Sequence, residues 1–180
     1  MIDTKKILQK YYDETSESYK ILLRHSQSVV QKSLEIARRN PQENFDLVFL
    51  EEAAMLHDIG IFLTNAPHIF CFGEKPYICH NYLGSEILQK EGLPKHALVC
   101  ERHTGTGISR KQIEAENLPL PLRDMLPVSS EEQLICFADK FFSKRNLEIE
   151  HSVDEIRKDL SKFGAETVAR FDKWNERWNS

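Results

Sequence analysis

Apolar side chains recur at helical spacing along most of the chain, and this pattern predicts an all-α protein. Between residues 17 and 39, for example, Leu22, His25, Val29 and Ile36 fall on one face, as expected for a helix with one buried side. No segment alternates between apolar and polar residues clearly enough to predict a strand. The pattern predicts helices at about residues 3–13, 17–39, 46–58, 79–91, 94–103, 109–116, 130–145 and 152–177.

Two irregular stretches separate these helices. Residues 61–78 hold two prolines, Gly73 and several aromatic side chains, which predicts an ordered loop that could cover a site. Residues 117–130 hold three prolines, so we expect a connection there rather than a helix. The serines and glutamates at its end favour a capped start for the helix that follows.

The last predicted helix begins with a capping box, Ser152-x-x-Glu155, and carries an apolar face that includes Trp174 and Trp178. We interpret this face as the side that packs on the protein core. A homodimer contact through the two tryptophans is the alternative, because residue spacing alone does not reveal whether a face is exposed.

The length and charge of the chain narrow its class. Its 180 residues suit a single domain, spanning residues 1–180, that buries its own core. The net charge of −4 provides no basic field for polynucleotides or for anionic membranes. No apolar stretch approaches the roughly 18 residues that span a bilayer, and the first residues lack the apolar region of a signal peptide. We therefore expect a cytoplasmic protein with no membrane partner.

Four ionisable residues lie within apolar helical stretches, and they are the strongest indication of function. His25 lies on the apolar face of its helix, Asp139 lies within an apolar run, and His57 and Asp58 end another such run. Burying an isolated carboxylate or a charged imidazole is costly, so such groups pair, change protonation state or coordinate an ion. The four residues therefore predict a metal site.

Two further histidines extend this site. Two imidazoles and two carboxylates form a mixed nitrogen and oxygen ligand set that suits divalent ions such as manganese, iron, zinc or magnesium. A second ion is favoured because Asp58 can bridge through its other oxygen while His80 and His103 supply two more imidazoles. Two ions about 3.5–4 Å apart clamp the oxygens of a phosphoryl transfer and acidify a shared water to hydroxide. We expect one or two bound divalent ions (Fe, Mn, Mg, Zn or Ni), and two are favoured. The expected reaction is hydrolysis of a phosphoester or phosphoanhydride.

The cysteines offer a competing interpretation. Cys79-His80 and Cys100-x-x-His103 combine residue types that bind structural zinc. We rank this site lower, because it would leave the other ionisable residues of the interior unexplained. Disulfides are not expected, since the four cysteines include no C-x-x-C pair.

The order of these residues resembles the HD-domain superfamily of metal-dependent phosphohydrolases, in the branch with the His-Asp-Ile-Gly signature. The matching motifs are His25-Ser26, His57-Asp58-Ile59-Gly60, His80, His103 and Asp139-Lys140, within about residues 20–145. The resemblance implies an HD-domain helical bundle with its core at about 20–145 and the helix at about 152–177 packed on it. It also implies a first metal held by His25, His57, Asp58 and Asp139, and a second held by Asp58, His80 and His103.

Three branches of the superfamily are relevant. Small stand-alone His-Asp-Ile-Gly proteins of unassigned substrate are similar around Gly92-Leu-Pro and Arg102-His103-Thr104. Bacterial hydrolases that split diadenosine tetraphosphate symmetrically with a di-iron centre are similar at His80-x-x-x-Gly84 and Ala138-Asp139. The cyclic-dinucleotide phosphodiesterases share the layout, but this chain lacks their Gly-Tyr-Pro motif after His103, which disfavours that activity.

The expected substrate is a small nucleotide or another phosphate ester, and Asp58 is the expected centre of catalysis. Lys140 and Arg102 are further candidates because ammonium and guanidinium groups bind phosphate, although a solvent-exposed position is the alternative for both. His68, in the loop after the His-Asp doublet, is a candidate substrate contact. Two other functions stay open: symmetrical hydrolysis of a dinucleoside tetraphosphate, and a non-catalytic HD sensor that binds a nucleotide or a partner.

Overall fold

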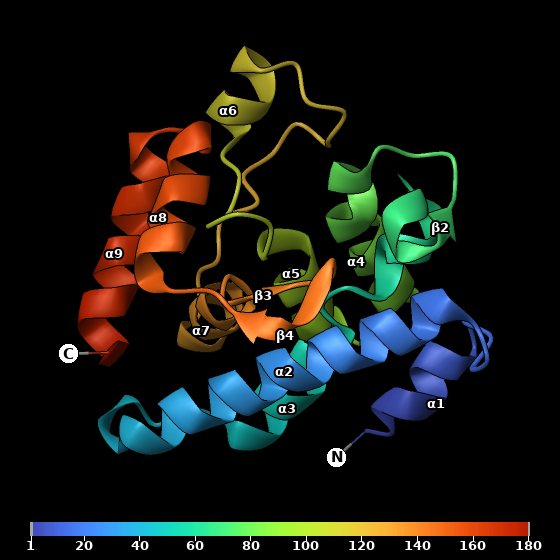
Figure 1. The fold of residues 1–180 in the computed structure, drawn as a ribbon, viewed down its shortest axis with the longest axis horizontal. Helices are drawn as coiled ribbons and strands as arrows, with labels where there is room; N and C mark the ends of the chain where they lie inside the picture. Colours follow the sequence, from blue (N-terminus) through green and yellow to red (C-terminus); the bar gives the residue numbers. More distant parts are fainter. Residues whose placement is uncertain (1, 180) are drawn as a thin grey trace.

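The computed structural model describes residues 2–179, and helices make up nearly all of its regular structure (Figure 1). The α-helices are α1 Thr4–Gln9, α2 Glu17–Arg39, α3 Leu47–Leu56, α4 His80–Lys90, α5 Pro94–Arg102, α6 Arg110–Ala115, α7 Ser130–Asp139, α8 Val153–Leu160 and α9 Ala165–Asn179. Short 3-10 helices lie between them: η1 Pro41–Glu43, η2 Ile59–Leu63, η3 Pro67–Ile69, η4 Tyr77–Cys79 and η5 Ser161–Phe163. The predicted all-α fold is confirmed. No helix in this part of the chain is long and apolar enough to cross a bilayer.

The expectation that the chain forms no strands was wrong. Two small antiparallel pairs are present: β1 Asn65–Ala66 with β2 Cys71–Phe72, and β3 Phe142–Ser143 with β4 Asn146–Glu150. The sequence of β4, Asn-Leu-Glu-Ile-Glu, does alternate between polar and apolar residues, but the alternation covers only five residues and most of the strand is exposed. So short a run is a weak strand signal, and the β3–β4 hairpin was missed for that reason.

The hairpin also shortens the helix that was predicted to reach residue 145. Helix α7 ends at Asp139, and the chain then turns into β3. Ion pairs to α2 hold the hairpin: Lys32 Nζ lies 2.6 Å from Glu150 Oε1, and Arg24 pairs with Glu148. Figure 1 shows the orange hairpin lying against the middle of α2. The residues after Asp139 therefore stay beside the end of α7 instead of extending away from it.

The single C-terminal helix predicted at residues 152–177 is in fact two helices. Helix α8 begins at the expected Ser152–Glu155 capping box, but η5 and Gly164 separate it from α9. Gly164 has a φ of +100°, a left-handed conformation that glycine adopts without steric cost. The chain reverses there, and α8 and α9 lie side by side (Figure 1).

The two C-terminal tryptophans belong to the core. Trp174 and Trp178 are 5% and 2% exposed, and the ring of Trp178 packs on Phe137 of α7 with 5.5 Å between ring centroids. The interpretation of this face as a core-packing surface is confirmed. The homodimer contact considered for these two rings is not available, because the monomer already covers them.

Two apolar clusters fill the interior and meet along α2 and α3. The first packs the later part of α2 and most of α3 against α7, α8 and α9, and the second packs the start of α2 against α1, η2, α4 and α5. Along α2 the buried residues pass from Leu22 in the second cluster to Val29 in the first, with His25 and Ser26 between them. The polar interior residues therefore lie at the boundary between two apolar cores.

A close approach of η2 to α4 sets the spacing within this polar region. A Cβ atom at Gly60 would collide with the carbonyl oxygen of His80 and with the backbone of Gly84, so only glycine permits the contact. A Cβ at Gly84 would in turn meet the thiol of Cys100 in α5. The two glycines thus bring Asp58, just before η2, close to His80 at the start of α4.

Candidate metal centre

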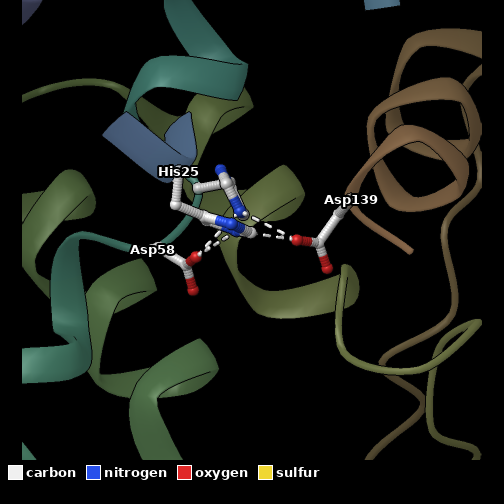
Figure 2. A group of neighbouring side chains, drawn as sticks. His25, Asp58 and Asp139 are labelled. Carbon is white, nitrogen blue, oxygen red and sulfur yellow. Dashed lines mark hydrogen bonds and ion pairs between the residues drawn. The ribbon is translucent and has the colours of Figure 1, made fainter. Parts of the chain in front are cut away.

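Four side chains from three segments converge at the boundary between the two cores; we call them the four-residue group. His25 lies in α2, His57 and Asp58 follow α3, and Asp139 ends α7. His25 Nε2 lies 2.9 Å from Asp139 Oδ1 and 3.2 Å from Asp58 Oδ2, and His57 Nε2 lies 2.9 Å from Asp58 Oδ2. Figure 2 shows His25, Asp58 and Asp139 pointing toward one another. The ligand atoms of the four residues all lie within 4.8 Å of one another, close enough to share one ion.

His80 and His103 form a three-residue group with the other oxygen of Asp58. The Nε2 atom of each imidazole lies 3.4 Å from Asp58 Oδ1, and the two Nε2 atoms lie 3.1 Å apart. Asp58 thus presents Oδ2 to the four-residue group and Oδ1 to the three-residue group. The structure brings together all six residues that the sequence singled out, in two buried sets that share Asp58.

Three of the imidazoles are oriented by the same local arrangement. Each one donates its Nδ1–H to the carbonyl oxygen three residues earlier: His57 to Ala54 at 2.6 Å, His80 to Tyr77 at 2.6 Å and His103 to Cys100 at 2.7 Å. Each of these histidines caps the C-terminal end of a helical segment, where carbonyl groups lack partners within the helix. Donation from Nδ1 leaves Nε2 with a free lone pair, which is the tautomer that metal binding requires.

Hydrogen bonding among the six residues of the four-residue and three-residue groups, which we call the cluster residues, is incomplete. The Nε2 atom of His57 and the Oδ1 atom of Asp58 are buried and make no hydrogen bond within residues 2–179, although buried polar atoms rarely lack one. The Nε2 atoms of His80 and His103 face each other as two lone pairs, because both rings carry their hydrogen on Nδ1. A divalent cation would satisfy these atoms, and the imidazole and carboxylate set fits iron, manganese, zinc or magnesium.

Both carboxylates of the cluster remain ionised. Burial opposes the charged form of Asp58, but the charges of His57 and Lys144 hold its pKa well below the ordinary value. Burial acts in the same way on Asp139, and there Lys140 and the hydrogen bond from His25 hold the pKa well below the ordinary value. The interior therefore carries two negative charges that attract cations.

The imidazoles respond to these charges differently. Burial lowers the pKa of His80 to about 3 and also lowers the pKa of His103, so both rings are neutral ligands. Burial lowers the pKa of His57 as well, but the charges of Asp58 and Asp139 outweigh it and raise that pKa to about 9. Without another cation, the carboxylates thus draw a proton onto His57, and a metal ion would displace that proton.

Two lysines reach the same carboxylates from the hairpin side. Lys140 Nζ lies 2.7 Å from Asp139 Oδ2, and Lys144 Nζ lies 2.5 Å from Asp58 Oδ2. Burial lowers the pKa of both ammonium groups, but the adjacent carboxylates outweigh this effect. The pKa of each group therefore lies above its ordinary value, and both groups stay charged. Lys144 and the four-residue group therefore share one oxygen of Asp58.

A cleft of about 490 Å³ opens above the two ligand groups. His80, His103 and Asp139 lie at its base, the β3–β4 hairpin forms one wall, and α8 contributes another. Its basic lining residues are His68, Lys140, Lys144, Arg145 and His151. Such a lining concentrates positive charge around the cleft and favours an anionic ligand.

The other residues that were predicted to contact the substrate differ in whether they line this cleft. His68 and Lys140 line it. Arg102 does not: its guanidinium donates to Glu132 Oε2 at 2.9 Å, which places the side chain against the start of α7. This position gives no support to the phosphate contact expected of Arg102, because neighbouring positions on a helix point in different directions and, of the two, only His103 lines the cleft.

Several cleft residues had no clear signal in the sequence. Lys144 was missed because the segment after Asp139 was expected to continue as a helix, and His151 belongs to no motif that would have marked it. The alternative zinc site was wrong: Cys79 donates to the Pro119 carbonyl and Cys100 to the Asn81 carbonyl. Within residues 2–179, neither ligand group includes a cysteine.

Comparison with known proteins agrees with this geometry. Residues 22–143 match the family model of the HD domain, a span that contains all six cluster residues, and the chain belongs to the HD-domain family. No solved structure matches the chain.

Relatives of known sequence extend the comparison. An uncharacterized protein of Methanocaldococcus jannaschii is 34% identical over 131 residues, which cover 72% of this chain and 70% of that protein. A tRNA (cytidine(56)-2'-O)-methyltransferase of Thermoplasma volcanium is 30% identical over 85% of this chain, and one of Picrophilus torridus is 32% identical over 68%. The matched segments span 41% and 32% of these two methyltransferases, which are therefore much longer proteins.

Proposed function

We propose that this protein is a metal-dependent phosphohydrolase that cleaves a phosphoester or phosphoanhydride bond of a small nucleotide-like substrate. One observation carries the proposal: Asp58 joins two ligand groups at the base of a cleft lined by Lys140, Lys144 and Arg145. In a phosphoryl transfer, the negative charge of the reacting phosphoryl group must be held in place and neutralised. Anionic ligands for metal ions, lying below cationic side chains, suit that task.

The six cluster residues divide the task of holding the ions. His25, His57, Asp58 and Asp139 would hold one divalent ion, and Asp58, His80 and His103 would hold a second. Bound ions supply acidification of a water molecule and neutralisation of charge on the phosphoryl oxygens. The Nδ1 hydrogen bonds of His57, His80 and His103 keep the ring planes fixed, so the ligand atoms need little reorganisation.

The residues of the cleft would hold the substrate. The ammonium groups of Lys140 and Lys144 donate charge-assisted hydrogen bonds to phosphate oxygens, and the guanidinium of Arg145 can bind two oxygens at once. Helix α8 and the hairpin flank the same space. The substrate is thereby oriented with its phosphorus toward the base of the cleft.

Two observations define the substrates to be tested first. Three cationic residues within positions 140–145 suit a polyphosphate chain, which keeps symmetrical dinucleoside tetraphosphate hydrolysis as the second candidate. The similarity to longer proteins named as tRNA methyltransferases brings small RNA-derived phosphodiesters, such as 2′,3′-cyclic nucleotides, into the same panel. A non-catalytic sensor is less well supported, because it has no need of two ligand groups with unsatisfied atoms.

The test combines metal analysis with hydrolysis. The protein is loaded with Mn²⁺ or Fe²⁺ and assayed against nucleoside mono-, di- and triphosphates, 2′,3′-cyclic nucleotides and dinucleoside tetraphosphates. We expect about two ions per chain, as two-metal phosphohydrolases hold, and turnover of at least one substrate class. Metal bound at this level with no turnover in any class would favour the sensor and contradict the proposal.

Asp58→Asn is the decisive variant, because it keeps the shape of the side chain and removes the charge that both ligand groups share. We expect metal content to fall and activity to drop more than about 100-fold, since loss of even a supporting residue costs roughly 10- to 100-fold. Asp154→Asn is the matched control, because that carboxylate is 92% exposed at the start of α8. Unchanged turnover in Asp58→Asn would remove the cluster from the reaction.

A further inference from the structure

A second cavity lies next to the cleft, and the chemistry described above does not use it. Its volume is about 140 Å³, and its apolar lining comes from Ile78, Ile108, Leu118 and Phe163. The ring of Phe163 is 57% exposed, so it lies at the rim instead of packing into the core. The cavity is bordered by α6 on one side and by η5 and α9 on another.

The cavity and the cleft are neighbouring parts of one site. Thr104 and Gly105 line both of them. The consecutive residues Tyr77 and Ile78 are likewise divided, with Tyr77 in the cleft and Ile78 in the cavity. A molecule with its phosphate in the cleft can therefore extend across Thr104 into the apolar cavity.

The hydroxyl of Thr104 indicates a ligand at this junction. Its oxygen is buried and makes no hydrogen bond within the described chain, and buried hydroxyls normally have a partner. The nearby Thr106 differs, because its hydroxyl donates to the Thr167 carbonyl at 3.1 Å. A polar atom of a bound substrate would supply the missing partner of Thr104.

The wall between cleft and cavity is held in place. Arg170 of α9 donates to the carbonyl oxygen of Thr106 at 3.1 Å and to that of Gly107 at 3.3 Å. These bonds attach the loop that contains Thr104 to α9, the C-terminal helix. The cavity is therefore formed before any ligand arrives, which favours specific binding.

We infer that this apolar cavity is the subsite for the base of a nucleotide whose phosphate occupies the cleft. The inference rests on the proposed function and specifies its substrate class. Phe163 stacks on the face of the base, Thr104 bonds the sugar at the junction, and Gln112 and Glu116 offer polar groups to the edge of the base. A phosphate ester that lacks a base fills only the cleft.

The experiment compares the four common nucleoside 5′-monophosphates with ribose 5-phosphate on the metal-loaded protein. Hydrolysis is measured as kcat/KM, and binding is measured by calorimetry with non-hydrolysable 5′-methylenephosphonate analogues of the same compounds. We expect the preferred nucleotide to exceed ribose 5-phosphate by at least about tenfold in both measurements, because stacking of one base on an aromatic ring has an effect of this order.

Phe163→Ala tests the subsite directly, and the exposed position of the ring protects the fold from the change. We expect this variant to lower kcat/KM and affinity for the nucleotide on the order of tenfold, with ribose 5-phosphate and metal content unaffected. Phe72→Ala is the matched control, because Phe72 is 75% exposed on β2 and lines neither cavity. Thr104→Val, which keeps the shape of the side chain, should weaken binding of the nucleotide and of ribose 5-phosphate alike, because both compounds carry the sugar.

The outcomes separate this inference from the proposed function. Equal turnover of ribose 5-phosphate and nucleotides, unchanged in Phe163→Ala, would overturn the base subsite and leave the phosphohydrolase intact. Absence of turnover in every substrate class assayed for the proposed function, with nucleotide analogues bound through Phe163, would support the subsite and overturn the hydrolysis. Equal losses for both ligands in Phe163→Ala would also overturn the subsite, because the residue would then act on the whole cleft.

Discussion

The base of the cleft and its hairpin wall are built in opposite ways. At the base, the six metal-ligand residues are at most 8% exposed, and three imidazoles are each fixed by a backbone carbonyl. Strand β4 is mostly exposed, and surface ion pairs such as Arg24 with Glu148 attach it to α2. Pairs of this kind contribute only about 0–1 kcal/mol each. The base is therefore rigid, whereas the wall can adjust.

This difference assigns separate tasks to the two regions. Metal ions require ligand atoms at fixed distances, and buried helix ends provide them. Substrates differ in shape, and the exposed Arg145 at the turn of the hairpin can follow them, whereas the Lys144 side chain is only 12% exposed and lies closer to the base. Changes at the base should therefore alter metal content and turnover together, while changes in the wall should alter substrate affinity alone.

The largest expected effect is at the base, where His57→Ala and His80→Ala distinguish the two ligand groups. Each should lower kcat more than about 100-fold. His80→Ala should retain about one ion, because the four-residue group stays complete, whereas His57→Ala should lose that ion. Metal analysis and single-turnover kinetics provide the two readouts.

His96→Gln is a suitable control for the base variants. His96 is also buried, but it contacts Glu52 at 3.3 Å outside both ligand groups, and glutamine can keep that contact. Identical loss of all metal in His57→Ala and His80→Ala would mean that the two groups bind as one unit, and the division between them would have to be abandoned.

A smaller effect is expected in the wall, from Lys144→Met. The variant removes one charged donor to phosphate, and a hydrogen bond to a charged group contributes about 1.5–3 kcal/mol, so KM should rise by roughly tenfold or more. Metal content should not fall, since Lys144 contacts Asp58 Oδ2 as a competitor of the ion. The dependence of KM on salt should also weaken.

Lys111→Met, at an exposed position of α6, controls for the loss of one positive charge from the surface. If Lys144→Met loses metal while KM for the remaining holoenzyme is unchanged, Lys144 supports the base and does not bind substrate. The contrast between a metal-binding base and a substrate-binding wall would then fail at this residue.

The same contrast explains how far the sequence could predict the site. His25, His57, Asp58 and Asp139 stood out because ionisable groups in apolar helical stretches are costly unless they share an ion. The hairpin residues had a weaker signal: β4 alternates over only five residues and is mostly exposed, and Lys144 reaches Asp58 only because the chain turns after Asp139. Burial at the base left several marked positions in the sequence, whereas the wall left one short alternation.

Two expectations differ from the structure for local reasons. The helix predicted at residues 152–177 passed over Gly164, because the apolar spacing on either side of it favoured one helix over two. Arg102 was selected because it adjoins His103 in sequence, although neighbouring helix positions point in different directions. The first difference comes from extending a periodic pattern through a glycine, and the second from treating proximity along the chain as proximity in space.

The smallest effect on catalysis is expected from Arg102→Met, which should leave kcat and KM within about twofold, the behaviour of a position away from the site. The variant should instead lower the melting temperature. Glu132 is only 7% exposed and accepts from both Arg102 and the Val128 amide, so loss of the guanidinium leaves a buried carboxylate partly unsatisfied, at a cost of about 1–3 kcal/mol.

For a chain of this length, each kcal/mol shifts the melting temperature by about 2–4 °C, so a decrease of several degrees should be measurable by calorimetry. Adding Glu132→Gln to Arg102→Met should recover part of that loss, because the amide no longer buries a charge. A rise in KM like that of Lys144→Met, with an unchanged melting temperature, would return Arg102 to the substrate site. It would also show that the wall extends beyond the hairpin to the end of α5.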